Sequence, residues 1–139
     1  MKANQMALDL LVFYHAELRK LYSEGGLSRY PPHIKHYNFC TVWSDLMDLQ
    51  LRKNSVPSRI IVVNTTAPRL THEGGWAYRN FHRSVLVDNQ VYDASSSEPV
   101  PVHIADYPDF FAEDVIFLYY LSEQRPFLVK EKSKLFYRN

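Results

Sequence analysis

One predicted β-hairpin constrains the fold more than any other feature of the chain. Two strand-forming runs, 81–87 and 90–93, flank the dipeptide Asp88-Asn89, and a two-residue turn at that dipeptide sets the register of the pair. In this register His82 and Asp93 share one face as diagonal neighbours, roughly 7–8 Å apart at the backbone. A three-residue turn would instead place Asp93 on the face opposite His82. A contact between these two side chains therefore requires the shorter turn.

The single cysteine of the chain, Cys40, is predicted in the first turn of a helix. Asn38 is a favoured N-cap residue, which makes Phe39 the first and Cys40 the second helical residue. The helix dipole and the unpaired backbone N–H groups favour a thiolate there, and the same N–H groups can stabilise an oxyanion. We therefore expect the pKa of the Cys40 thiol to lie well below the ~8.5 of a free cysteine. The alternative is an inert buried thiol, because free cysteine is often fully buried.

Cys40, His82 and Asp93 together have the order and spacing of a Cys-His-Asp hydrolytic site. The order resembles that of the papain-like and transglutaminase-like cysteine hydrolases. The residue pattern of the segments 81–87 and 91–93 resembles that of the His and Asp segments of glutamine-specific amidohydrolases and bacterial deamidase effectors. The resemblance covers residues 38–95 and implies that Cys40 is the nucleophile, His82 the general base and Asp93 the residue that orients it.

Two features of that superfamily are missing from the chain. The Asp-Cys-Ser-Gly run of the NlpC/P60 enzymes is absent, and the glutamine upstream of the papain cysteine has no clear counterpart. Asn38 and Asn80 are the candidates for the role of that glutamine beside the oxyanion. The resemblance implies a glutamine deamidase of the effector or toxin type that acts on a protein substrate. A cysteine peptidase or a peptidoglycan amidase is the nearest alternative, and a non-catalytic protein-binding adaptor is an alternative of another class.

Residues 65–78 are predicted to form a long loop with Gly74-Gly75 in it, and loops of that length are often functional. Trp76 and Tyr78 in this loop are candidates for substrate contact, although packing of the loop onto the body of the domain is the more usual role for such an aromatic side chain. We expect no cofactor and no metal. His33, His36 and Cys40 have a possible zinc-ligand spacing, but a fourth ligand would have to come from elsewhere in the chain.

The remaining segments predict an α+β fold in which the cysteine-bearing helix packs on a small antiparallel sheet. Apolar residues recur at helical spacing from Ala7 to Tyr22, and residues 58–64 form a continuous apolar run that is typical of a buried strand. Residues 115–121 are apolar enough for a strand, but periodicity does not exclude a helix over 109–122. The length of 139 residues predicts one domain over residues 1–139. The resemblance implies a papain-like or transglutaminase-like core.

Composition excludes several function classes. Hydrophobic residues make up 46% and aromatic residues 14% of the chain, which argues against disorder. The net charge is +1, with 16 basic and 15 acidic residues, and it gives no electrostatic reason to expect a nucleic-acid partner. No apolar run reaches the ~20 residues of a membrane helix, and a signal-peptide pattern is missing. We expect a cytoplasmic protein, or one exported without a cleavable signal peptide.

Overall fold

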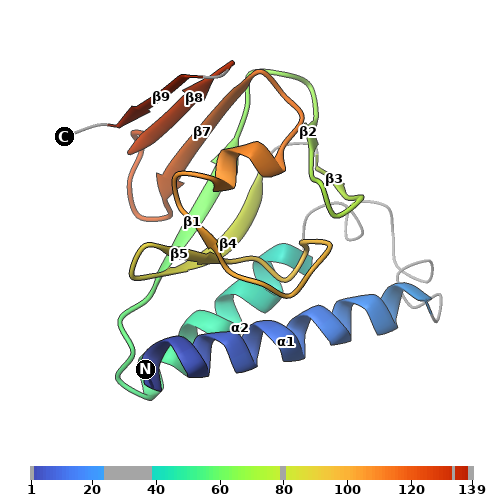
Figure 1. Ribbon diagram of the computed structural model, residues 1–139, viewed down its shortest axis with the longest axis vertical. Coiled ribbons are helices and arrows are strands. Elements are labelled where there is room, and N and C mark those ends of the chain that lie inside the picture. Colours follow the sequence, from blue (N-terminus) through green and yellow to red (C-terminus); the bar gives the residue numbers. More distant parts are fainter. Residues whose placement is uncertain (1, 24–38, 79–80, 133, 138–139) are drawn as a thin grey trace.

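Helices and antiparallel strands make up the computed structural model, which describes residues 2–23, 39–78, 81–132 and 134–137. This is an α+β architecture, as the sequence predicts (Figure 1). The helical elements are α1 (Lys2–Ser23), α2 (Phe39–Lys53) and the short 3-10 helix η3 (Tyr107–Phe110). The strands are β1 (Arg59–Asn64), β2 (Leu70–Thr71), β3 (Ala77–Tyr78), β4 (His82–Val87), β5 (Gln90–Tyr92), β6 (Val102–His103), β7 (Val115–Tyr120), β8 (Leu128–Glu131) and β9 (Lys134–Tyr137).

Within the described residues, seven of the strands form one antiparallel sheet in the order β6-β5-β4-β1-β7-β8-β9. The sheet is larger than the small sheet that the sequence predicts. Figure 1 shows both long helices under the β4–β5 end of this sheet, while β8 and β9 lie at the far end near the C-terminus. Helix α2 packs on β4 and β1, and α1 packs on α2 and reaches β4 and β5. The sheet therefore has one covered end and one open end.

The β4–β5 hairpin has the register that a His82–Asp93 contact requires. Val87 pairs with Gln90, and Val85 pairs with Tyr92. Asp88 adopts the left-handed region at φ 54°, a conformation that aspartate tolerates better than most residues. The prediction of a two-residue turn is therefore confirmed.

Helix α2 buries the face that carries the cysteine. Its buried side chains are Cys40, Trp43, Ser44, Met47 and Leu51, and the spacing of three and four residues places them along one stripe. Leu46 lies off this stripe and is 45% exposed. The helix ends at Lys53, and Ser55 follows at φ 61°.

In one other segment the structure differs from the sequence prediction, and in another it decides between two alternatives. The predicted loop 65–78 contains a two-stranded sheet, because β2 and β3 pair through Leu70 with Tyr78 and Thr71 with Ala77. Residues 115–121 were ambiguous, and the structure shows strand β7 between β1 and β8. Among the described residues, the structure contains no helix with the length and apolar character needed to cross a membrane.

Candidate active site

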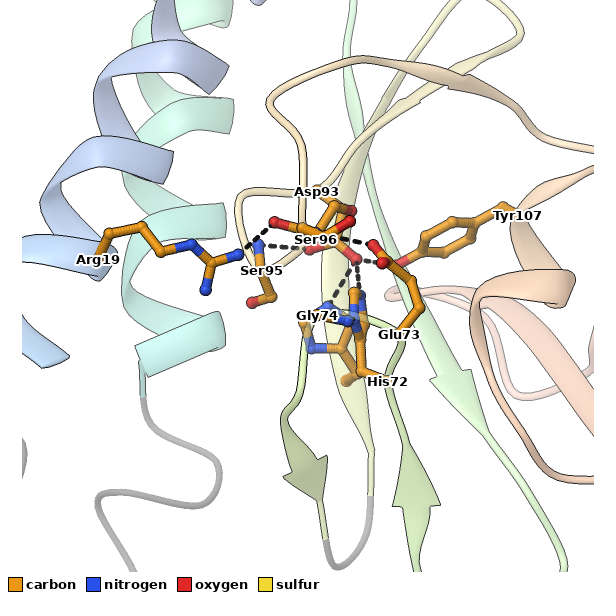
Figure 2. Close-up of polar contacts among 10 residues, drawn as sticks. Arg19, His72, Glu73, Gly74, Asp93, Ser95, Ser96 and Tyr107 are labelled. Atoms are coloured by element: carbon orange, nitrogen blue, oxygen red, sulfur yellow. Dashed lines mark hydrogen bonds and ion pairs between the residues drawn. The ribbon is translucent and has the colours of Figure 1, made fainter. Parts of the chain in front are cut away.

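Asp93 is the centre of a buried cluster of polar side chains. It follows β5 directly, and only 2% of its surface is exposed. One carboxylate oxygen, Oδ2, lies 2.8 Å from His72 Nε2, 2.9 Å from His82 Nε2 and 2.6 Å from the Tyr107 hydroxyl, which donates to it. The other oxygen, Oδ1, accepts the backbone N–H of Ser95 at 2.9 Å. Figure 2 shows His72 and Tyr107 converging on Asp93 from different parts of the chain.

His82 opens β4 and meets Asp93 across the hairpin, as the sequence predicts. The imidazole is fully buried, and its Nδ1 atom has no hydrogen-bond partner among the described residues. Since Nε2 donates to the carboxylate, a neutral His82 carries its proton on Nε2 and a lone pair on Nδ1. This is the tautomer that a general base needs when the orienting carboxylate contacts Nε2.

Burial and charge act in opposite directions on the pKa values of His82 and Asp93. Burial lowers the pKa of His82, although the Asp93 carboxylate acts to raise it, so the neutral imidazole is favoured. Burial by itself raises the pKa of Asp93, but the adjoining imidazoles and their hydrogen bonds hold that pKa well below its usual range. The site therefore keeps an ionised carboxylate next to a neutral histidine at neutral pH.

Cys40 lies in the first turn of α2 with its side chain against β4. The backbone N–H of Arg83 hydrogen-bonds the thiol, which places the sulfur beside the strand residue that follows His82. The Arg83 side chain also pairs with Asp45 on α2, so helix and strand are held together near the cysteine. The structure thus brings Cys40 to the strand that carries His82.

The expectation of a depressed thiol pKa is wrong for this conformation. Burial raises the pKa of Cys40 to about 11, and the negative charge of Asp93 also acts to raise it. The hydrogen bond from Arg83 acts in the other direction without reversing the shift. Only 3% of the Cys40 surface is exposed, and removal from water disfavours the thiolate more than the helix terminus favours it.

The four candidates for oxyanion or substrate contact have different outcomes. Tyr78 is buried, and its ring stacks on that of His82, with centroids 4.4 Å apart and an interplanar angle of 25°. Trp76 is half-buried in the turn between β2 and β3 and packs against the core. Asn38 and Asn80 lie outside the described residues, so their proposed roles stay predictions.

The same cluster contains a set of possible metal ligands. One ligand atom each from His72, His82 and Asp93 lies within 4.8 Å of the other two, and all three side chains are buried. In the arrangement described, however, the two Nε2 atoms face a carboxylate oxygen at hydrogen-bond distance. A metal ion would need both nitrogens without their protons. The expectation of no metal stays a prediction, and His33 and His36 lie outside the described residues.

Sequence reasoning missed His72 and Tyr107. His72 lies just after β2 in a segment predicted as a loop, and Tyr107 begins η3 after an irregular, proline-containing stretch. Neither residue shares a strand or a periodic spacing with Asp93, so no local pattern could have joined them. The only signal in the sequence is the short spacing of His72 and Gly74. Glycine indicates a tight turn, and such a turn can bring a backbone N–H to the histidine ring.

Comparisons with known proteins do not add to this geometry. Comparison with family models, with curated proteins and with solved structures found no match.

Proposed function

We propose that this protein is a cysteine-dependent amide hydrolase with Cys40 as nucleophile, His82 as general base and Asp93 as the carboxylate that orients it. The finer fold that we propose is a papain-like or transglutaminase-like core. The observation that carries the proposal is the unequal use of the two His82 nitrogens. Nε2 is bonded to Asp93, whereas Nδ1 is buried without a hydrogen-bond partner among the described residues, on a strand whose next N–H contacts Cys40.

The proposed reaction is acyl transfer to sulfur. His82 Nδ1 takes the Cys40 proton as the sulfur attacks the carbonyl carbon of a substrate amide, and the C=O electron pair moves to oxygen. In this mechanism the backbone N–H groups at the start of α2 stabilise that oxyanion. The C–N bond then breaks as His82 returns the proton to the leaving nitrogen. Water hydrolyses the thioester, releases a carboxylic acid and restores the thiol.

The raised thiol pKa favours one of two forms of this mechanism. Cysteine hydrolases either keep a thiolate–imidazolium pair at rest or remove the proton during attack. Here burial favours a neutral thiol and a neutral imidazole at rest. We therefore propose that proton transfer to His82 accompanies substrate binding and attack.

The preferred substrate is the side-chain amide of glutamine in a protein, and the product nitrogen leaves as ammonia. Tyr78 lies on the His82 ring, where it is placed to pack against the stem of an inserted side chain. Peptide-bond cleavage, or cleavage of a peptidoglycan amide, would follow the same chemistry with a different leaving amine. A protein-binding adaptor is the alternative of another class, and the exposed side chains of Phe136 and Tyr137 on β9 favour it.

Cys40→Ala tests the enzyme hypothesis. We expect ammonia release from a glutamine-containing protein such as casein to fall by at least about 10³-fold, because the covalent step loses its nucleophile. Val42→Ala is the matched control, since it changes an exposed side chain in the same turn of α2. Thermal melts of both variants monitor folding. Retention of full activity by Cys40→Ala would exclude the proposed mechanism, and release of new amino termini in place of ammonia would identify a peptidase.

A further inference from the structure

Two histidines contact the same oxygen of Asp93, but their second ring nitrogens differ. His72 Nδ1 accepts the backbone N–H of Gly74 at 2.8 Å, whereas His82 Nδ1 has no hydrogen-bond partner among the described residues. The two rings lie 5.0 Å apart at an interplanar angle of 75°. One imidazole therefore has both nitrogens engaged, and the other has one nitrogen available for chemistry.

The contact with Gly74 determines where His72 carries its proton. A ring nitrogen that accepts a backbone N–H has no proton of its own, so the proton of a neutral His72 is on Nε2 and is donated to Asp93. Protonation of Nδ1 would break the Gly74 hydrogen bond in a fully buried site. The neutral His72 ring therefore donates in one direction, from Nε2 to Asp93.

The backbone around His72 is held closely against the Asp93 loop. A Cβ atom added to Gly74 would lie 1.9 Å from the backbone oxygen of Ser95, so only glycine allows this approach. Glu73 Oε1 accepts the backbone N–H of Ser97, and Arg19 donates to the backbone oxygen of Ser96 at 2.5 Å (Figure 2). The Gly74 approach and the Glu73 contact therefore join the turn that carries His72 to the loop that carries Asp93, and Arg19 holds the same loop from α1.

We propose that His72 is a positioning residue of the site: an imidazole that donates from Nε2 and holds the Asp93 carboxylate in the orientation at which it contacts His82 Nε2. This inference rests on the proposed function. His72 does not touch the substrate or the sulfur in the proposed mechanism. It supplies one of the three donors on Oδ2, so its loss would free the carboxylate to turn away from His82 and weaken the general base.

The electrostatic surroundings of Asp93 decide the expected pH effect. The titratable side chains that interact with its carboxylate come from five elements or turns, namely Cys40, His72, Tyr78, His82 and Tyr107. Burial lowers the pKa of His82, and the Asp93 carboxylate acts to raise it. A carboxylate that turns away from His82 loses part of this effect, so removal of His72 should lower the pKa of His82 and move the acid limb of the activity profile to lower pH.

The test compares His72→Leu with His72→Gln in the full chain. Leucine removes the donor, whereas the glutamine amide can donate to Asp93 from a similar position. We expect His72→Leu to lower kcat by about tenfold to a hundredfold with little change in KM. We expect His72→Gln to recover most of that loss. His103→Leu is the matched control, because it removes an exposed histidine at the edge of the sheet.

Nitrogen-15 NMR of the imidazole rings gives a second measurement that needs no substrate. In the unmodified protein we expect the neutral His72 ring to carry its proton on Nε2, and in His72→Leu we expect a downward shift of the His82 titration. A neutral His72 ring with its proton on Nδ1 would overturn the proposal even if the leucine variant fails to fold. So would an unchanged His82 titration and unchanged kcat in a folded leucine variant, or a glutamine variant as impaired as leucine.

The outcomes also separate this proposal from the proposed function. If Cys40→Ala is inactive while His72→Leu behaves like the unmodified protein, only the positioning role fails. If Cys40→Ala retains full activity, the hydrolase mechanism itself fails, whatever the histidine variants do.

Discussion

Strands β4 and β9 belong to the same sheet, yet every residue of β4 is buried and every residue of β9 is exposed. Strand β4 lies between β5 and β1 and is covered by α2, whereas β9 is an edge strand that pairs with β8 alone in the described part of the chain. The buried strand carries His82, Arg83 and Ser84, all polar. The exposed strand carries Leu135, Phe136 and Tyr137, all apolar or aromatic. These six side chains reverse the usual distribution, whereas Val85, Leu86 and Val87 of β4 follow it.

The difference shows why chemistry can be assigned to one end of the sheet. A buried polar group must find partners inside the protein, and its position and protonation state are then set by those partners. His82 and Asp93 are placed in this way. An exposed apolar side chain has no such constraint and can only offer a contact surface. The hydrolase that we propose therefore uses the covered end, and the adaptor alternative would use the open end.

Among the substitutions that test this comparison, Asp93→Asn should have the largest effect on turnover and stability. We expect turnover to fall by about 10³–10⁴-fold, because the imidazole loses the carboxylate that fixes its tautomer. The free energy of unfolding should fall by about 2–4 kcal/mol, since three buried donors then face an uncharged amide.

The matched control for this change is Glu131→Gln at the end of β8, which is exposed. It should leave turnover unchanged and alter stability by less than about 0.5 kcal/mol. Activity assays and urea unfolding of both variants give the comparison. Equal behaviour of the two variants would show that the buried carboxylate has no special role.

Truncation of one apolar side chain at each end tests the difference in packing. Val85 in β4 is fully buried, whereas Leu135 in β9 is 39% exposed. We expect Val85→Ala to lower the free energy of unfolding by about 2–3 kcal/mol, because it leaves a cavity between the sheet and the helices. Leu135→Ala should cost less than about 1 kcal/mol, although it removes more atoms. Urea denaturation measures both, and a larger effect at Leu135 would mean that the open end is covered in solution.

The last expected effect is confined to alkaline pH and comes from Cys40. Its pKa in the folded protein is raised to about 11, so the unfolded chain loses this proton first as the pH rises. The thiol therefore contributes stability that is fully present below the ~8.5 of a free cysteine and is lost as the pH approaches the folded pKa. The loss over this interval should be on the order of 3 kcal/mol.

Cys40→Ala should lack this alkaline loss, and the difference between its unfolding curves and those of the unmodified protein isolates the thiol from the buried tyrosines. The rate of alkylation by iodoacetamide should be low at neutral pH and should rise only in alkaline solution. Rapid alkylation at pH 6 would instead indicate a resting thiolate and would favour the ion-pair form of the mechanism.

The sequence predicted the local part of the site well. The turn at Asp88-Asn89 determines which residues of the two adjoining strands face each other, so the His82–Asp93 contact followed from the alternation of side chains along the hairpin. The capping residue Asn38 likewise predicted Cys40 in the first turn of a helix that packs on the sheet, and α2 has this arrangement. Both predictions depend on residues close together in the chain, where backbone geometry leaves few arrangements.

Only the tertiary structure decided which distant groups meet at Asp93 and how they change its chemistry. His72 is 21 residues and Tyr107 is 14 residues from Asp93 in the sequence, and no periodicity relates them. The pKa of Cys40 was predicted from the helix terminus alone, and it was wrong because burial depends on the packing of the whole domain. Local sequence thus determined the turn, the strand faces and the helix face, since these follow from backbone geometry. The protonation states and the second histidine were decided by tertiary packing, because burial and electrostatics sum over every group that surrounds the site.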